Sequence, residues 1–124
     1  MQKVTGIGGG FFKASDAKRL MEWYDEHLGI QFQHGFFQFK WADEGEKATG
    51  STTFSIFKED SAHFSPSEKP FMINFRVADL RALLAELQEK GVTIIGDMQE
   101  YEYGRFGWIV DPEGNKIELW EPID

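Results

Sequence analysis

The sequence predicts an α+β fold in which two βαβββ units form a curved mixed sheet around a concave cavity. The chain repeats itself, at an offset of 63 residues near the start of each repeat and 62 near its end. Each repeat contains one amphipathic helical segment with strand-like runs before and after it. Because each helix needs a sheet face to cover its apolar stripe, both helices are expected on the convex face.

Each repeat contains one helix with a predicted capping residue at both ends. Apolar residues recur three and four positions apart over residues 17–28 and again over residues 80–87. Asp, Ser and Gly at the ends of these runs are typical helix caps. The expected caps are Asp16 or Ser15 and Gly29 in the first helix, and Asp79 and Gly91 in the second.

Strand-like runs rich in β-branched and aromatic residues surround each helix. The expected strands are Thr5 to Lys13, Gln31 to His34, Phe36 to Trp41, Thr52 to Phe57, Phe71 to Val77, Thr93 to Glu102, Phe106 to Val110 and Lys116 to Glu121. Asp43 to Gly50 is expected to be a polar loop, and the polar residues 58–70 a linker. The chain is thus interpreted as one domain, residues 1–124, with units at 1–57 and 71–124.

Composition excludes several classes of function. Thirteen Lys and Arg against 21 Asp and Glu give a net charge of −8, which disfavours nucleic acid and other acidic partners. The absence of cysteine excludes disulfides, thiolate metal sites and a cysteine nucleophile. Because the sequence has neither a signal-like N-terminus nor an apolar run of about 18 residues, a cytoplasmic protein without membrane contact is expected.

The most informative segment is a predicted hairpin near the C-terminus. Its turn, Asp111 to Asn115, contains Pro and Gly at positions where turns favour them. Alternation along the following strand puts Ile117 and Leu119 on one face and Glu118 on the other. If Ile117 and Leu119 face the core, Glu118 points into the predicted cavity.

Three segments resemble the vicinal oxygen chelate superfamily, which includes glyoxalase I, bleomycin-resistance proteins, fosfomycin-resistance enzymes and extradiol dioxygenases. They are DAKRLMEWYDEHLG at 16–29, the Val77-Ala78-Asp79 entry to the second helix, and the DPEGNKIELWEP hairpin at 111–122. The resemblance covers essentially the whole chain and implies the glyoxalase fold. It leaves the chemistry open, because this scaffold serves unrelated reactions and simple binding.

The resemblance also implies four metal-ligand positions on the cavity face. Counting from the helix starts, they fall at Gly9, at Met72, within Thr53 to Ser55 and at Glu118. Only Glu118 is a strong ligand, and a tight divalent site needs three or four. We therefore expect no cofactor, with a divalent metal disfavoured. The histidines His27, His34 and His63 are expected to be surface or satisfied side chains, although a metal held through His34 or His63 remains an alternative.

The remaining site candidates are residues expected to surround Glu118. Tyr101, Tyr103 and Arg105 precede the hairpin and are expected at the cavity mouth, where they can meet an anionic or carbonyl ligand. Trp41, Phe54, Met72, Trp108 and Trp120 complete the predicted ligand-binding set. As a group, the aromatic members favour a flat or apolar ligand.

Two functions follow from these expectations. The first is a homodimeric protein, similar to the bleomycin-resistance proteins, that encloses a small organic molecule without a metal. Whether it also transforms that molecule is left open by the sequence. The alternative is a metal-dependent lyase, isomerase or dioxygenase of the glyoxalase type. In that reading Glu118 is a metal ligand or removes a proton next to a carbonyl. Without a metal, only Arg105 or a tyrosine is available to stabilise the oxyanion that proton removal creates, and its effect is smaller than that of a metal.

Overall fold

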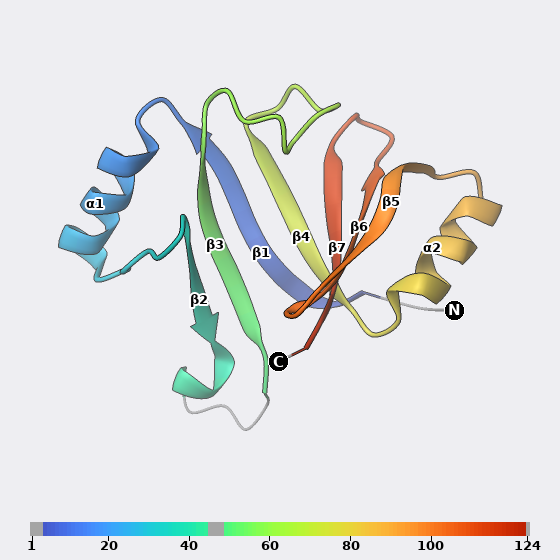
Figure 1. The fold of residues 1–124 in the computed structure, drawn as a ribbon, viewed down its shortest axis with the longest axis horizontal. Coiled ribbons are helices and arrows are strands. Elements are labelled where there is room, and N and C mark those ends of the chain that lie inside the picture. Colours follow the sequence, from blue (N-terminus) through green and yellow to red (C-terminus); the bar gives the residue numbers. More distant parts are fainter. Residues whose placement is uncertain (1–3, 45–48, 124) are drawn as a thin grey trace.

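The computed structural model describes residues 4–44 and 49–123, which form one curved seven-stranded sheet and two α-helices (Figure 1). The strands are β1 (Val4–Ala14), β2 (Phe36–Lys40), β3 (Ser51–Lys58), β4 (Phe71–Val77), β5 (Thr93–Tyr101), β6 (Gly104–Val110) and β7 (Lys116–Pro122). The helices are α1 (Ala17–Leu28) and α2 (Leu80–Glu89), with a short 3₁₀ helix, η1, at Trp41–Glu44. The sheet order is β2-β3-β1-β4-β7-β6-β5, and the sheet is not closed.

The two halves meet at β1 and β4, which pair antiparallel in the middle of the sheet. Each of these strands also pairs in parallel with the last strand of its own half, β1 with β3 and β4 with β7. The two sequence repeats therefore have the same central strand pairing, and together they form the mixed sheet that the sequence predicts. The curvature of that sheet leaves one concave face (Figure 1).

The predicted strand at Gln31 to His34 does not form. In its place, Gln33 makes one isolated bridge to Phe36, while His34 and Gly35 adopt positive φ angles of 56° and 87°. Two successive positive φ angles turn the chain sharply, which is incompatible with an extended strand. The first half accordingly has three strands and the second has four. The predicted loop Asp43 to Gly50 lies partly outside the described residues.

The helices begin and end where their capping residues predict. Asp16 accepts a hydrogen bond from the backbone N of Arg19, and Asp79 accepts one from the backbone N of Ala82. Gly29 follows α1 with a φ of 70°. Figure 1 shows the helices at opposite ends of the convex face. Within the described residues, no helix is long and apolar enough to span a membrane.

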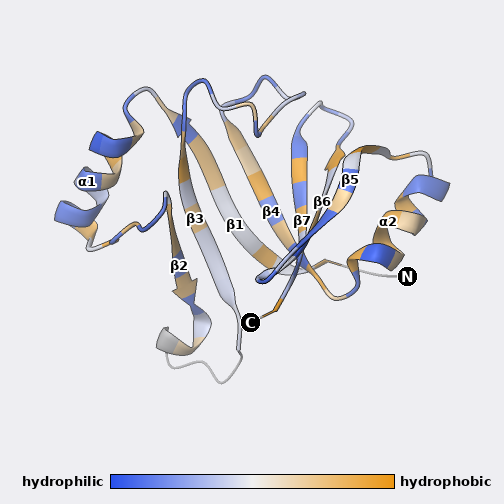
Figure 2. Cartoon of the chain, in the orientation of Figure 1, coloured by the Kyte–Doolittle hydropathy of each residue, from blue (hydrophilic) through white to orange (hydrophobic). Residues whose placement is uncertain are grey.

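Figure 2 shows hydrophilic and hydrophobic residues alternating along β7. Because successive side chains of a strand point to opposite faces, the sheet has one face covered by the helices and one that lines the cavity. Along β7, Leu119 packs with Val77, Leu80 and Leu83 under α2, as the hairpin pattern predicts. A second apolar cluster joins the halves on the other face and contains Phe11, Phe64 and Met72. The sheet thus has a helix-supported core on one side and an aromatic cavity on the other.

Candidate functional site

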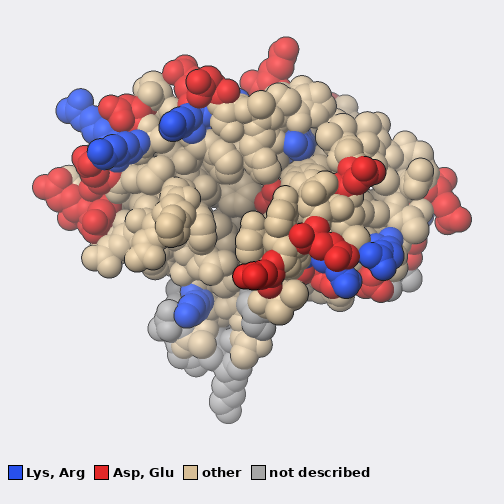
Figure 3. Space-filling model, in the orientation of Figure 1, with Lys and Arg blue, Asp and Glu red and all other residues tan. Residues whose placement is uncertain are grey.

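A cavity of about 720 Å³ opens on the concave face, a size usual for small-molecule sites. Figure 3 shows a hollow near the middle of the molecule, with charged side chains lying mainly around it. Ring side chains from both halves form most of the wall. The first half contributes Phe11, Phe36 and Phe57, and the second contributes Tyr101, Tyr103, Phe106, Trp108 and Trp120.

A row of four paired positions crosses the sheet at the cavity. Gly9 of β1 pairs with Thr53 of β3 on one side and with Asn74 of β4 on the other. Asn74 in turn pairs with Glu118 of β7. The register therefore puts Asn74, and not Met72, beside Gly9. Counting from the helix misplaces this position because the connection from the row to the helix cap is two residues shorter in the second half.

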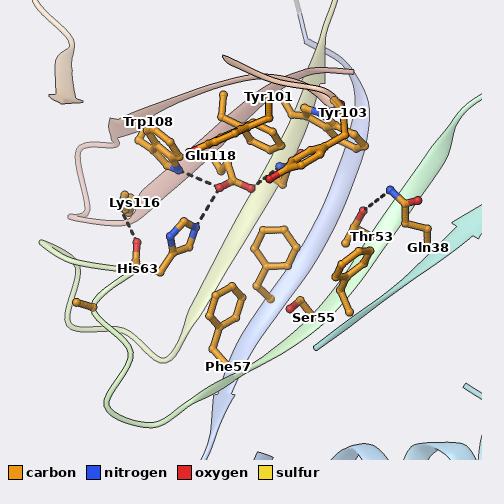
Figure 4. Close-up of a pocket in the computed structure, with 16 residues that line it drawn as sticks. Gln38, Thr53, Ser55, Phe57, His63, Tyr101, Tyr103, Trp108, Lys116 and Glu118 are labelled. Carbon is orange, nitrogen blue, oxygen red and sulfur yellow. Dashed lines mark hydrogen bonds and ion pairs between the residues drawn. The ribbon is translucent and has the colours of Figure 1, made fainter. Parts of the chain in front are cut away.

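Glu118 is 4% exposed, and both of its carboxylate oxygens are hydrogen-bonded (Figure 4). Its Oε1 accepts from Trp108 Nε1 at 2.9 Å and lies 3.1 Å from His63 Nε2. Its Oε2 accepts from Asn74 Nδ2 at 2.6 Å. Removing a carboxylate from water is costly unless donors replace the water, and these three side chains do so.

His63 reaches Glu118 from the segment that connects the halves. Phe64 beside it is completely buried and anchors the segment against the sheet. The imidazole stacks on Phe57 with ring centroids 5.3 Å apart and an interplanar angle of 4°. Residues 59–70 therefore contain no helix or strand, yet they place a histidine in the cavity wall.

Lys116 brings a positive charge to the same cluster. Its Nζ donates to the backbone oxygen of His63 at 2.6 Å and lies 5.5 Å from the centroid of the Trp108 ring. Burial lowers the pKa of Lys116 below its ordinary value of 10.5, and attraction to the Glu118 carboxylate opposes part of this effect.

Five of the residues proposed from sequence come together around the cavity. Glu118, Tyr101, Tyr103, Trp108 and Trp120 all line it. Tyr101 and Tyr103 stack on each other with centroids 5.3 Å apart and remain about half exposed at the mouth. Trp120 is buried and stacks on Phe106.

The other four candidates lie outside the cavity lining. Arg105 alternates onto the helix-covered face and pairs with Glu100 and Glu121, and Phe54 packs there against Tyr24. Trp41 stacks against Arg76 beyond the cavity, and Met72 is buried between Phe11 and Phe64. For Arg105 and Phe54, the alternation of side chains along a strand explains the difference.

Sequence reasoning did not predict that His63 and Asn74 contact Glu118, and it proposed His63 only as an alternative metal ligand. Lys116 and Gln38 also line the cavity and were not among the predicted site residues. Asn74 had a usable signal, because it interrupts the apolar strand FMINFRV with a polar side chain on the face opposite Phe75 and Val77. His63 had none, since an irregular polar segment has no periodicity from which to infer a facing direction. His34 is exposed in a turn, and His27 stacks on Trp23 at the end of α1.

The four expected metal positions do not supply a ligand set. A Cβ at Gly9 would lie 2.5 Å from the backbone oxygen of Thr53, so a ligand side chain there requires a backbone shift. Asn74 uses its amide nitrogen on Glu118. Within residues 4–44 and 49–123, no three His, Asp or Glu side chains gather around a common point. One carboxylate and one imidazole, Glu118 and His63, fall short of the three or four ligands of a tight divalent site.

Comparisons with known proteins identify relatives of the chain as a whole. No curated protein sequence matches the chain significantly. Methylmalonyl-CoA epimerase from Streptomyces coelicolor superposes with a TM-score of 0.74 at 19% identity, over 98% of this chain and 100% of that one. The Mycobacterium tuberculosis epimerase gives 0.63 at 25% identity, over 98% and 90%. A chain described as NAD-dependent benzaldehyde dehydrogenase from Legionella pneumophila gives 0.60 at 15% identity, over 93% and 98%.

These neighbours share the vicinal oxygen chelate fold that the hairpin and the helix entry predict. A match to a protein-family model agrees with these structural neighbours and covers more of the chain than the motifs do. The model of the Glyoxalase/Bleomycin resistance protein/Dioxygenase superfamily matches residues 12–119, and the chain belongs to that superfamily.

Proposed function

We propose that this chain binds a small, flat organic molecule in the cavity without a resident divalent metal. The observation that carries the proposal is a cavity of about 720 Å³ with rings on both walls and a buried carboxylate that three of the protein's own side chains already satisfy. Aromatic walls offer a large contact area to a flat ligand at little entropic cost.

Polar groups opposite Glu118 define how such a ligand is oriented. Gln38 and Thr53 line the cavity on the β2 and β3 side, with Gln38 Nε2 3.5 Å from Thr53 Oγ1. This long contact leaves both side chains available to a ligand. The cavity therefore suits a flat body with a hydrogen-bonding group on its edge.

Thermal-shift screening of small aromatic compounds tests this proposal, because a ligand that binds only the native state raises the melting temperature. Ala62→Trp is the blocking variant, since Ala62 is exposed and lines the cavity. Ala85→Trp is its matched control on the exposed surface of α2. We expect stabilising compounds to act on the parent and on Ala85→Trp but not on Ala62→Trp. Equal shifts in all three proteins would remove the cavity as the binding site.

A metal-dependent lyase, isomerase or dioxygenase is the second candidate. The observation in its favour is the 3.1 Å approach of His63 to Glu118, which places one nitrogen and one oxygen donor side by side. Elemental analysis of protein purified without chelator or affinity metal decides between the candidates. One Ni, Zn, Fe or Mn per chain would establish the metal-dependent reading, and a substoichiometric content supports the metal-free one.

A homodimer is also part of the proposal. Along β4, Phe71 and Ile73 alternate with Met72 and Asn74 and so lie on the convex face, where they are 51% and 38% exposed. Large apolar side chains that adjoin on a sheet face favour contact with another surface. Sedimentation at micromolar concentration tests this, with a dimer in the parent and a shift toward monomer in Phe71→Ser/Ile73→Ser expected. A monomeric parent would overturn it.

A further inference from the structure

His63 and Glu118 form a histidine-carboxylate pair whose members differ in their access to the cavity. Nε2 of His63 lies 3.1 Å from Oε1 of Glu118. The side chain of His63 is 36% exposed and that of Glu118 is 6% exposed. A molecule in the cavity therefore meets the imidazole more readily than the carboxylate.

The carboxylate is committed to internal contacts. A carboxylate has about four lone-pair directions. Glu118 uses three of them, two on Oε1 toward His63 and Trp108 and one on Oε2 toward Asn74. Glu118 is thus arranged to hold its neighbours in place, with both of its oxygens already in contact with side chains of the protein.

The imidazole is fixed in one orientation. Phe57 stacks on its ring, Glu118 faces Nε2, and Lys116 holds its backbone oxygen (Figure 4). A carboxylate facing Nε2 favours the tautomer with the proton on that atom. The lone pair then lies on Nδ1, for which the described residues supply no hydrogen-bond partner.

From this geometry we infer that His63 is a catalytic base for carbon acids bound in the cavity, and that Glu118 is the residue that positions it. The inference rests on the proposed binding of a flat molecule. The substrate class is a flat compound with a C–H bond made acidic by an adjacent carbonyl or electron-poor ring. The proton moves from carbon to Nδ1, and the electron pair of the C–H bond passes into the carbonyl or ring. The imidazolium then returns the proton to carbon or to water.

The probe for this activity is 5-nitrobenzisoxazole, a flat carbon acid that a single base opens without a metal. The base takes the proton on the ring carbon, the C–H electron pair forms the nitrile, and the N–O bond breaks to release a coloured phenolate. Absorbance of the phenolate measures the rate. Since a positioned base contributes about 10²–10⁴-fold, we expect a clear acceleration over buffer and over a blocked cavity in Ala62→Trp.

Two substitutions separate the roles of the pair. We expect His63→Gln, which keeps a polar side chain beside Glu118, to lower the rate by about 100-fold. Glu118→Gln should lower it by about 10-fold, because the base remains but is less well oriented. His27→Gln is the matched control on the exposed end of α1 and should keep the parental rate. The inference is overturned if His63→Gln keeps its rate while Glu118→Gln loses all activity, since Glu118 would then be the base.

A second variant covers the case in which His63→Gln folds poorly. His63→Ala with added imidazole should recover part of the rate, whereas Glu118→Gln should not respond. Titration with 5-nitroindazole, a flat analogue that lacks the labile N–O bond, separates this inference from the binding proposal. Binding without turnover of 5-nitrobenzisoxazole overturns only the catalytic role of His63. Absence of both overturns the two together.

Discussion

The two halves of the sheet share a topology but differ in what they place in the cavity. At paired positions the first half presents Gly9 and Thr53, whereas the second presents Asn74 and a hydrogen-bonded Glu118. The helices differ in the same direction, since α2 buries Leu80 and Leu83 while no residue of α1 is fully buried. The second half thus holds the helix-packed core and the polar pair Asn74 and Glu118, together with five of the eight Phe, Tyr and Trp side chains of the cavity wall.

The largest test of this comparison removes matched leucines from the two helices. Leu80→Ala deletes a side chain with no exposed surface under α2 and should cost about 2–5 kcal/mol of unfolding free energy. Leu20→Ala in α1 removes a partly buried side chain and should cost less than about 2 kcal/mol. Urea unfolding measures both, and equal losses would show that the halves contribute alike.

The polar row offers the next largest contrast. Glu118→Leu leaves the donors of Trp108 and Asn74 buried without an acceptor and should cost about 3 kcal/mol. Thr53→Val at the matching position of the first half should change stability by about 0.5 kcal/mol or less. The same unfolding experiment applies. A stable Glu118→Leu protein would mean that the cluster is not needed for the fold.

Adjacent glycines in β1 sharpen the account of the absent ligand position. A Cβ at Gly9 would approach the backbone oxygen of Thr53 to 2.5 Å, whereas one at Gly10 would have nothing within 4 Å. Gly9→Ala should therefore cost about 2 kcal/mol, and Gly10→Ala should be neutral or slightly stabilising. Thermal melts of the two variants provide the comparison. A harmless Gly9→Ala would reopen that position to a ligand side chain.

The smallest effect concerns the hairpin turn of the second half. Hydrogen bonds from Asn115 hold the pKa of Asp111 below its ordinary value of 3.8. The side-chain amide of Asn115 makes the largest contribution, and its backbone N–H the next largest. A depressed carboxyl pKa contributes stability above the unfolded value, and that stability is lost as the pH falls through the folded value. Asp111→Ala should thus be less stable than the parent near pH 7, with a smaller difference at about pH 3. Unfolding midpoints at the two pH values test this, and a difference that does not shrink in acid contradicts it.

The sequence determines those parts of the fold that repeat or alternate. Caps at Asp16 and Asp79, the turn at Asp111 and the outward direction of Glu118 all follow from local rules, and the structure has them. His63 did not follow, because its direction depends on how Phe64 anchors an irregular segment to a distant strand. Local sequence patterns predict which face of a strand or helix a side chain occupies. They do not predict which irregular segment packs over that face.

Register explains the other differences between sequence and structure. Met72 and Asn74 point to the same face of β4, so alternation alone cannot choose between them. Pairing across β1 and β7 makes the choice, and that pairing is a tertiary property. For Arg105 and Phe54, the prediction of a cavity position fails for a simpler reason. Each lies one residue away from a cavity-facing position of its strand, so its side chain points to the helix-covered face.

The central claim is that the aromatic cavity binds a flat molecule without a metal. Binding of 5-nitroindazole, a flat aromatic compound, before and after chelation of metal ions tests this claim most directly. Calorimetric titration is carried out on the parent, on the same protein dialysed against EDTA, and on the dialysed protein with added Zn²⁺ or Ni²⁺. The account predicts one affinity in all three, and no binding to Ala62→Trp. Affinity that disappears with EDTA and returns with the added ion would contradict it.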